Sequence, residues 1–329
     1  MSEKTYYGGQ AVMEGVMMRG RTTMAVAVRA PSGEIAVYHE ELRGSNFAKR
    51  VRPLPFIRGV FMLWDTMVLG MRALVLSANV GLSEETDPAE ETEIEEPQTL
   101  AGIALWGTVA VSIAFSIGLF FILPLVAISF LDRYISSSIV SNVIEGFIRL
   151  GLLIGYMLAL RSIKDVRRVF MYHGAEHKTI NAYEAGDPLD VEHVRRHSLQ
   201  HTRCGTGFLL VVVLISIVIF AFLGRPDFLL RVASRIVFVP IIAAIAYEFI
   251  KWSAAHDTNS FVRILIAPSL ALQRLTTSEP DASMLEVAIV SLKRVLVAEE
   301  AWAMSEIERP DIVAIDETGR ELPVPEPAL

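Results

Sequence analysis

Charge-free apolar stretches are the clearest pattern along this 329-residue chain. Residues 100–131 hold no charged side chain over 32 positions, and residues 205–224 hold none over 20. Because roughly 20 apolar residues in a helix cross the hydrocarbon core of a bilayer, we predict that both stretches span a membrane. Residues 135–160 and 236–252 are also apolar, although each contains two charges. We interpret these as two further spans, which gives about four in all.

The charges inside the two weaker spans come in pairs of opposite sign. Glu145 and Arg149 are four residues apart, and Glu248 and Lys251 are three apart. Side chains at these separations are neighbours on a helix, so each pair can share the cost of leaving water. Ionisable groups inside a membrane usually face the interior of a helix bundle. We therefore expect both pairs to point away from lipid.

Basic residues predict the side of the membrane on which each loop lies, because they favour the cytoplasm. The segment between the second and third predicted spans is strongly basic, whereas the loop after the first span offers only Arg133. We therefore predict a multi-pass protein of the cell membrane with this segment and both termini in the cytoplasm. Residues 1–10 are polar and lack the apolar core of a signal peptide. The basic side chains of the segment are Arg161, Lys164, Arg167, Arg168, Lys178, Arg195, Arg196 and Arg203.

Two patterns precede the spans. Alternating apolar positions on both sides of Pro31-Ser32-Gly33 predict a β-hairpin. Residues 55–80 are mostly apolar, but Arg58, Asp65 and Arg72 recur every seven residues and share one helical stripe. We expect an amphipathic helix that lies in the membrane interface or packs on the bundle. A fifth span is the alternative, and it would move the N-terminus across the membrane.

These elements predict a mainly α-helical fold: a polytopic membrane protein with about four transmembrane helices and a small N-terminal β-containing cytoplasmic region. After the last span, Asp281 or Ser283 could cap a helix over residues 285–298. The predicted segments are a hairpin-containing cytoplasmic region (1–54), an amphipathic or membrane-associated helix (55–82), an acidic linker (83–98), a four-helix membrane domain (99–255) with a cytoplasmic histidine-rich loop (161–204), a C-terminal cytoplasmic segment (256–309) and a disordered tail (310–329).

Composition agrees with a membrane protein. Hydrophobic residues make up 52% of the chain, more than in a typical soluble domain. The net charge of −7 comes from residues 84–96, where eight acidic residues and no basic one predict a solvated linker rather than an acidic binding surface. A single cysteine cannot form an internal disulfide, which fits a reducing compartment. We expect the lipid bilayer as a partner, and no nucleic acid.

Histidines gather in one short segment. Five of the seven, together with the only cysteine, fall within residues 171–204. Among them, His173-Gly174-Ala175-Glu176-His177 forms a H-x-x-E-H motif. In the zinc peptidases that carry this motif, the inverzincins, the glutamate acts as general base on water activated by the metal. Glu176 is therefore the candidate base, although so short a motif is weak evidence by itself.

The apolar spacing and the Gly186-Asp187-Pro188 breaker predict a helix over residues 166–185. On this helix His173 and His177 lie one turn apart and share a face with Glu184. Two imidazoles at this spacing can reach one cation. We therefore expect a divalent metal, zinc by its preference for nitrogen and sulfur ligands.

A catalytic zinc site needs three protein ligands and one open position. Glu248 is the best candidate for the third, because the fourth predicted span returns it to the cytoplasmic side. His201 and Cys204, just before the third span, lie at the same surface and are the other candidates.

Each of these residues also has a structural interpretation. The two motif histidines could sit at the mouth of the bundle and hydrogen-bond to backbone or to Glu184. Glu248 could form a salt bridge with Lys251. His193 and His197, beside two arginines, favour an exposed helix rather than a metal site.

Five segments, taken together and in this order, resemble the YqhQ-like family of bacterial membrane proteins, a domain of unknown function described as a predicted metal-dependent enzyme. They are GGQAVMEGVMMRG at 8–20, HGAEHKTINAYE at 173–184, HTRCGTGF at 201–208, YEFIK at 247–251 and LQRLTTSEP at 272–280. The resemblance runs from about residue 7 to about residue 297. It singles out Glu14, His173, Glu176, His177, Lys178, His201, Arg203, Cys204, Glu248 and Lys251.

Two functional hypotheses remain. The first is a metal-dependent, hydrolase-type enzyme with its site at the cytoplasmic membrane face, acting on a lipid or membrane-associated substrate. In it Lys178 or Arg203 would meet an anionic substrate. The alternative is a non-enzymatic membrane scaffold or transport component, in which Glu145, Arg149, Glu248 and the histidines form a buried polar network or an ion path.

Overall fold

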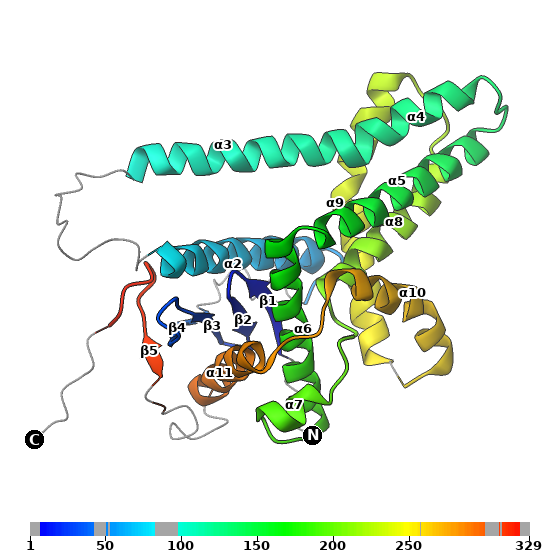
Figure 1. Ribbon diagram of the computed structural model, residues 1–329. Helices are drawn as coiled ribbons and strands as arrows, with labels where there is room; N and C mark the ends of the chain where they lie inside the picture. The colour runs from blue at the N-terminus through cyan, green and yellow to red at the C-terminus, as the bar shows by residue number, and fades with distance from the viewer. Residues whose placement is uncertain are drawn as a thin grey trace, which may run out of the picture.

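The computed structural model describes residues 7–42, 51, 53–82, 98–256, 258–299, 309 and 311–322. A small α/β unit and a group of long apolar helices that project from it make up the molecule (Figure 1). The elements are, in chain order, β1 (Gly8–Val12), β2 (Gly15–Arg19), β3 (Thr23–Arg29), β4 (Ile35–Glu41), α2 (Ile57–Leu82), α3 (Gln98–Ile117), the π-helical turn η1 (Gly118–Ile122), α4 (Leu123–Asp132), α5 (Ser138–Arg161), α6 (Lys164–Ala185), α7 (Val191–Arg195), α8 (Gly205–Ala221), α9 (Phe228–Ala255), α10 (Ser260–Thr276), α11 (Ala282–Ala298) and β5 (Ile312–Ala314).

A five-stranded sheet forms the centre of the α/β unit. Its strands follow the order β1-β2-β3-β4-β5, and the first four make an antiparallel meander. The predicted hairpin is β3 and β4, with Ala27 opposite Val37. Gly33 closes its turn at φ 94°, in the left-handed region that glycine adopts most easily. The N-terminal sheet is thus confirmed, and it has more strands than the hairpin alone predicted.

The last strand comes from the tail that we expected to be disordered. β5 pairs in parallel with β4, with Ile312 opposite Ile35. A further bridge joins Ile315 to Glu321. The prediction of disorder from residue 310 is therefore wrong for this part of the tail, because three residues at the edge of an existing sheet need no pattern of their own to pair with it.

Helices cover both faces of the sheet (Figure 1). Successive side chains of a strand point to opposite faces, and β2 shows the result. Val16 and Met18 pack towards α6 and α11, whereas Met17 packs against Ala73 and Leu76 of α2. Both faces are apolar, so β2 is an almost continuous apolar run rather than an alternating one. The unit is a three-layer arrangement in which α6 is a core helix.

The helix predicted over residues 55–82 is α2, and it lies against the sheet. Its charged stripe reaches the strands: Asp65 pairs with Arg19 at 2.5 Å and Arg72 with Glu40 at 2.9 Å. The opposite side of α2 exposes large apolar side chains, namely Ile57, Val60, Phe61, Trp64, Met67, Val68, Met71 and Val75. One side of this helix therefore belongs to the α/β unit, while the other presents an apolar surface.

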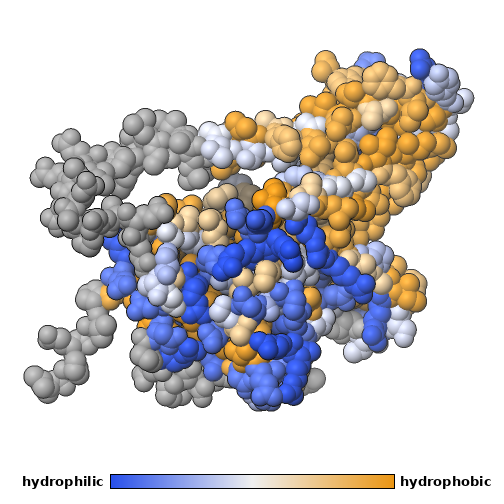
Figure 2. Space-filling model, viewed as in Figure 1, coloured by the Kyte–Doolittle hydropathy of each residue, from blue (hydrophilic) through white to orange (hydrophobic). Residues whose placement is uncertain are grey.

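Among the described residues, four helical segments are long and apolar enough to cross a membrane: α2, residues 107–132 of α3, η1 and α4, then α5 and α9. The number agrees with the prediction, but the set differs. The predicted third span is α8, an apolar helix of 17 residues that falls short of the length of the other four. Figure 2 shows the apolar surface gathered over the projecting helices and hydrophilic surface over the α/β unit.

The charges of the second predicted span are buried between helices, as expected. Glu145 accepts hydrogen bonds from Arg149 at 2.7 Å, from Arg235 at 2.8 Å and from Arg231 at 3.4 Å. Arg235 also lies 4.1 Å from the ring centre of Phe220. The two additional arginines were not expected here, because the fourth predicted span begins at residue 236, whereas α9 begins at Phe228.

Candidate metal centre

The H-x-x-E-H motif lies in the middle of α6, at the predicted place on the predicted helix. The helix ends at Gly186, whose φ of 80° suits a glycine cap. Tyr172, Ala175 and Ile180 on one side of α6 belong to the core formed with the sheet and α11. The motif is therefore held by the α/β unit, not by a loose loop at the mouth of the bundle.

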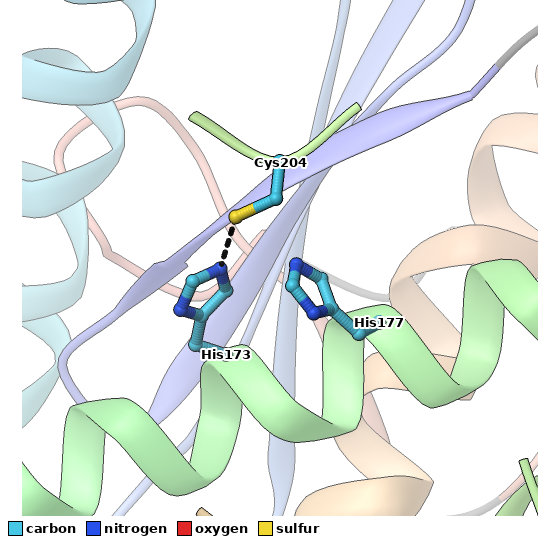
Figure 3. Close-up of side chains that lie close together, drawn as sticks. All are labelled: His173, His177 and Cys204. Carbon is cyan, nitrogen blue, oxygen red and sulfur yellow. Dashed lines mark hydrogen bonds between the residues drawn. The ribbon is translucent and has the colours of Figure 1, made fainter. Parts of the chain in front are cut away.

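Three side chains of the types that can bind a metal ion converge beside α6 (Figure 3). His173 and His177 project from the helix, and Cys204 is the residue that caps the N-terminus of α8. One ligand atom from each lies within 4.8 Å of the others, and the Cys204 thiol donates to Nε2 of His173 at 3.3 Å. Donor atoms around a tetrahedral zinc lie roughly 3.3–3.8 Å apart, given bond lengths of about 2.0–2.3 Å. The donor atoms would have to move by up to about 1–1.5 Å to reach that spacing.

Backbone carbonyls orient both imidazoles towards the cluster. Nδ1 of His173 donates to the carbonyl oxygen of Thr276 at 2.9 Å, and Nδ1 of His177 donates to that of Leu199 at 2.6 Å. A carbonyl can only accept, so Nδ1 carries the hydrogen and the lone pair of Nε2 faces the other ligands. Histidines that bind metals are usually oriented in this way.

The buried Nε2 of His177 provides the strongest test of whether the site fits a cation. It has no hydrogen-bond partner within the part of the chain that the structure describes. A buried acceptor without a partner is uncommon in folded proteins and calls for an explanation. Two imidazole nitrogens and one cysteine sulfur are a donor set that zinc binds. The amide of Thr206 also points at Sγ from 3.4 Å, and the N-terminus of a helix favours negative charge there.

Glu176 is buried beside the cluster, with Oε2 4.0 Å from Nε2 of His173. Burial raises the pKa of Glu176, while the neighbouring His173 and a hydrogen bond from the backbone of Gly9 act in the opposite direction. A carboxylate with a raised pKa is suited to accept a proton near neutral pH. The position of Glu176 is thus compatible with the general base that we predicted.

Gly9 is a part of this site that sequence reasoning missed. A Cβ atom at this position would lie 2.6 Å from the carbonyl oxygen of Met17 and 2.9 Å from Cγ of Glu176. Only glycine leaves room for β1 to pass this close to α6. The Gly8-Gly9 pair at the start of β1 is the sequence feature that could have indicated a close approach of the backbone here.

His201 lies next to the cluster without joining its donor atoms. Its ring centre is 5.6 Å from that of His177, and its Nε2 is 3.8 Å from Glu184. Burial lowers the pKa of His201. Arg203 forms an ion pair with the same carboxylate. Although burial opposes the effect, the neighbouring His201 and a hydrogen bond from Arg203 hold the pKa of Glu184 below its usual range.

Glu248 does not reach the histidines. Its carboxylate accepts from the Arg58 guanidinium at 2.5 and 2.8 Å and from the backbone N–H of Phe56 at 3.0 Å. Cys204, and not the preferred candidate Glu248, is therefore the third side chain beside the two histidines. The alternative pairing of Glu248 with Lys251 is not found either, because this side of α9 turns towards the start of α2.

Lys178 points away from the cluster. Its Nζ donates to the carbonyl oxygen of Arg195 at 2.7 Å and pairs with Glu279 at 2.8 Å. Glu14, in the turn between β1 and β2, accepts from Arg168 and from the Tyr172 hydroxyl, and so ties this turn to α6.

The two histidines that we assigned to an exposed helix lie apart from the cluster. His193 pairs with Asp190 at the start of α7, and His197 pairs with Asp187, both at 2.8 Å.

A family model described as a protein of unknown function, DUF1385, matches residues 54–298. The chain belongs to this family. It is also 32% identical over 296 residues to the uncharacterized protein YqhQ of Bacillus subtilis (strain 168), a match that covers 88% of this chain and 92% of that protein. No solved structure matches the chain. The family resemblance noted in the sequence is thus confirmed, but neither match names an activity, so the metal centre rests on its geometry.

Proposed function

We propose that this DUF1385 protein is a multi-pass membrane protein that binds a divalent metal, zinc, through His173, His177 and Cys204. The observation that carries the proposal is the unpartnered, buried Nε2 of His177, which faces a second imidazole and a thiol. The four apolar helices support insertion into the cell membrane. The basic residues between α5 and α8 favour a cytoplasmic location for the site.

We further propose that the bound metal serves hydrolysis. A zinc ion would act as a Lewis acid that activates water. Glu176 would then take the proton from that water and return it to the leaving group, because it is the buried carboxylate next to His173. Gly9 would hold the Glu176 side chain in place through its backbone N–H.

Metal analysis of the full chain tests this proposal. Protein purified in detergent without chelators is expected to contain about one zinc per chain. His173→Ala, His177→Ala and Cys204→Ala should lose most of it, whereas Glu176→Gln should keep it and lose catalytic function. His193→Ala, whose side chain pairs with Asp190 outside the cluster, is the matched control. Metal-free wild-type protein, or zinc retained in His177→Ala, would contradict the proposal.

The buried ion network favours a second candidate function, ion transport through the bundle. Glu145 meets three guanidinium groups among the projecting helices. Buried ionisable groups in membrane segments often mark ion or proton paths. In proteoliposomes, a transporter would lose flux in Glu145→Gln while its zinc content stayed unchanged. Equal and low flux in wild type and variant would argue against transport.

A further inference from the structure

A basic pocket of about 660 Å³ lies beside the candidate metal centre. Four cationic side chains line it, from Arg161, Arg167, Lys178 and Arg274, together with one carboxylate, Glu279. Glu279 pairs with Lys178 at 2.8 Å. The three arginines have no salt bridge to any carboxylate in the described part of the chain. The pocket therefore carries excess positive charge, which suits an anionic ligand.

Ser278 adds an independent sign of a ligand in the basic pocket. It lines the pocket, only 9% of its surface is exposed, and its Oγ has no hydrogen-bond partner among the described residues. A buried hydroxyl normally has a partner. An oxygen of a bound anion would accept a hydrogen bond from the Ser278 hydroxyl.

A second cavity, of about 390 Å³, is almost entirely apolar. It lies among α5, α8 and α9, and side chains such as Phe121, Leu153 and Phe220 form its walls. Its size is within the range of roughly 300–1,000 Å³ that small-molecule sites occupy. Arg149 lines it too, but that guanidinium already donates to Phe120, Glu145 and Ser216. The cavity therefore suits hydrocarbon, and an anion would not be drawn to Arg149.

The walls of the two pockets are formed by chain neighbours, and both walls contact the candidate ligands. Neighbouring residues line them on either side, with Leu160, Phe170 and Thr276 in the apolar cavity and Arg161, Met171 and Thr277 in the basic pocket. The carbonyls that orient the histidines also come from these walls. Thr276 of the apolar cavity accepts from His173, and Leu199 of the basic pocket accepts from His177. A molecule that filled both pockets would pass next to the candidate ligands.

We propose that the two pockets together bind one anionic lipid, with its hydrocarbon chain in the apolar cavity and its phosphate on Arg161, Arg167 and Arg274. The proposal deepens the proposed function, because it names the substrate class of the same site and rests on that function for any reaction. Binding itself requires only the two pockets. Phosphate could also come from solution, so the test separates a lipid from free phosphate.

Native mass spectrometry of the full chain in detergent measures the bound lipid directly. The probes are phosphatidic acid and phosphatidylcholine with identical chains, each with and without inorganic phosphate as competitor. We expect at least about fivefold higher occupancy by phosphatidic acid, the size of effect that two or three partly exposed charges produce. Equal occupancy by the two lipids would overturn the proposal. Displacement of phosphatidic acid by equimolar phosphate would also overturn it, since the site would then bind the anion alone.

Two pairs of variants locate the binding. Arg167→Gln with Arg274→Gln should abolish the preference for phosphatidic acid, whereas Arg195→Gln, on α7 outside the basic pocket, should not. Val213→Phe, which fills the apolar cavity, should lower occupancy by phosphatidic acid at least as strongly as the two arginine substitutions do. Val218→Phe on the exposed side of the same helix α8 is its control. Occupancy that is unchanged in both test variants would place the lipid elsewhere and refute the proposal.

Zinc content, measured on the same samples, keeps the two proposals distinguishable. Normal zinc without selective lipid binding would refute the lipid site and leave the metal centre standing. Selective lipid binding by zinc-free wild-type protein would refute the metal centre and leave the lipid site standing.

Discussion

Glu145 is the carboxylate whose removal should destabilise the bundle most. Its side chain is 1% exposed and lies between Arg149, Arg231 and Arg235, so it neutralises three neighbouring guanidinium groups. Asp132, which pairs with Arg231, is the other carboxylate of this group and is partly exposed. Glu145→Gln keeps the size of the side chain and one acceptor oxygen but removes the charge.

The structure sets the expected size of this effect. Removing one partner of a buried ion pair costs about 3–5 kcal/mol, because the remaining charge is left without compensation. We expect the lower end, about 3 kcal/mol, since the glutamine carbonyl can still accept some of the four hydrogen bonds that the carboxylate receives. At roughly 2–4 °C per kcal/mol, the unfolding midpoint should fall by about 6–12 °C.

Thermal unfolding of the detergent-solubilised chain, followed by tryptophan fluorescence, measures this shift. Glu192→Gln is a matched control, because Glu192 and Arg196 have the same i,i+4 spacing as Glu145 and Arg149, but Glu192 is 76% exposed. An exposed pair contributes about 0–1 kcal/mol, so this variant should unfold close to the wild type. Equal unfolding midpoints for Glu145→Gln and Glu192→Gln would refute the argument that burial makes the Glu145 ion pairs important for stability.

Two further predictions concern the α/β unit. Gly9→Ala should lower zinc content and thermal stability, because the new methyl group would lie 2.6 Å from a carbonyl of β2 and 2.9 Å from Glu176; Gly8→Ala, with no atom within 4 Å, should match the wild type in both measurements. Asp281 caps α11 by accepting from the N–H of Met284, so Asp281→Ala should lower the free energy of unfolding by about 1 kcal/mol. Burial acts against it, but hydrogen bonds from Ser283 and Met284 hold the pKa of Asp281 below its usual value. Its charged form therefore stabilises the fold at neutral pH, and this contribution should be lost as the pH falls below about 4. Asp281→Asn keeps a capping oxygen but no titrating group, so its melting temperature should not show this loss at acid pH. The same pH dependence of melting in the wild type and in Asp281→Asn would contradict the role given to the Asp281 charge.

The sequence predicted those features that depend on neighbouring residues in the chain. The helix that carries His173 and His177 follows from local spacing and from Gly186, and the Glu145–Arg149 pair follows from helical geometry. The identity of the third side chain beside the histidines does not follow from local spacing, because it depends on how α8 and α9 pack against other elements.

Two other features depended on contacts between distant parts of the chain. Glu248 satisfied every local criterion for a ligand, yet packing turns it towards Arg58 at the start of α2. Gly9 acts on Glu176 across 167 positions of sequence, and β5 forms only because β4 offers a free edge. None of these relations leaves a periodic signal in one stretch of chain.

The position of Cys204 links two parts of the molecule. The two histidines belong to the α/β unit, whereas Cys204 is the N-cap residue of the apolar helix α8, so the three donors meet only while that helix is docked against the unit. A cation bound by all three side chains would link α8 to the α/β unit, and its release would allow α8 to move relative to that unit. Because this thiol is the only one in the chain and is buried, faster alkylation after a chelator removes the zinc would report release of the cation, with no second cysteine contributing to the signal.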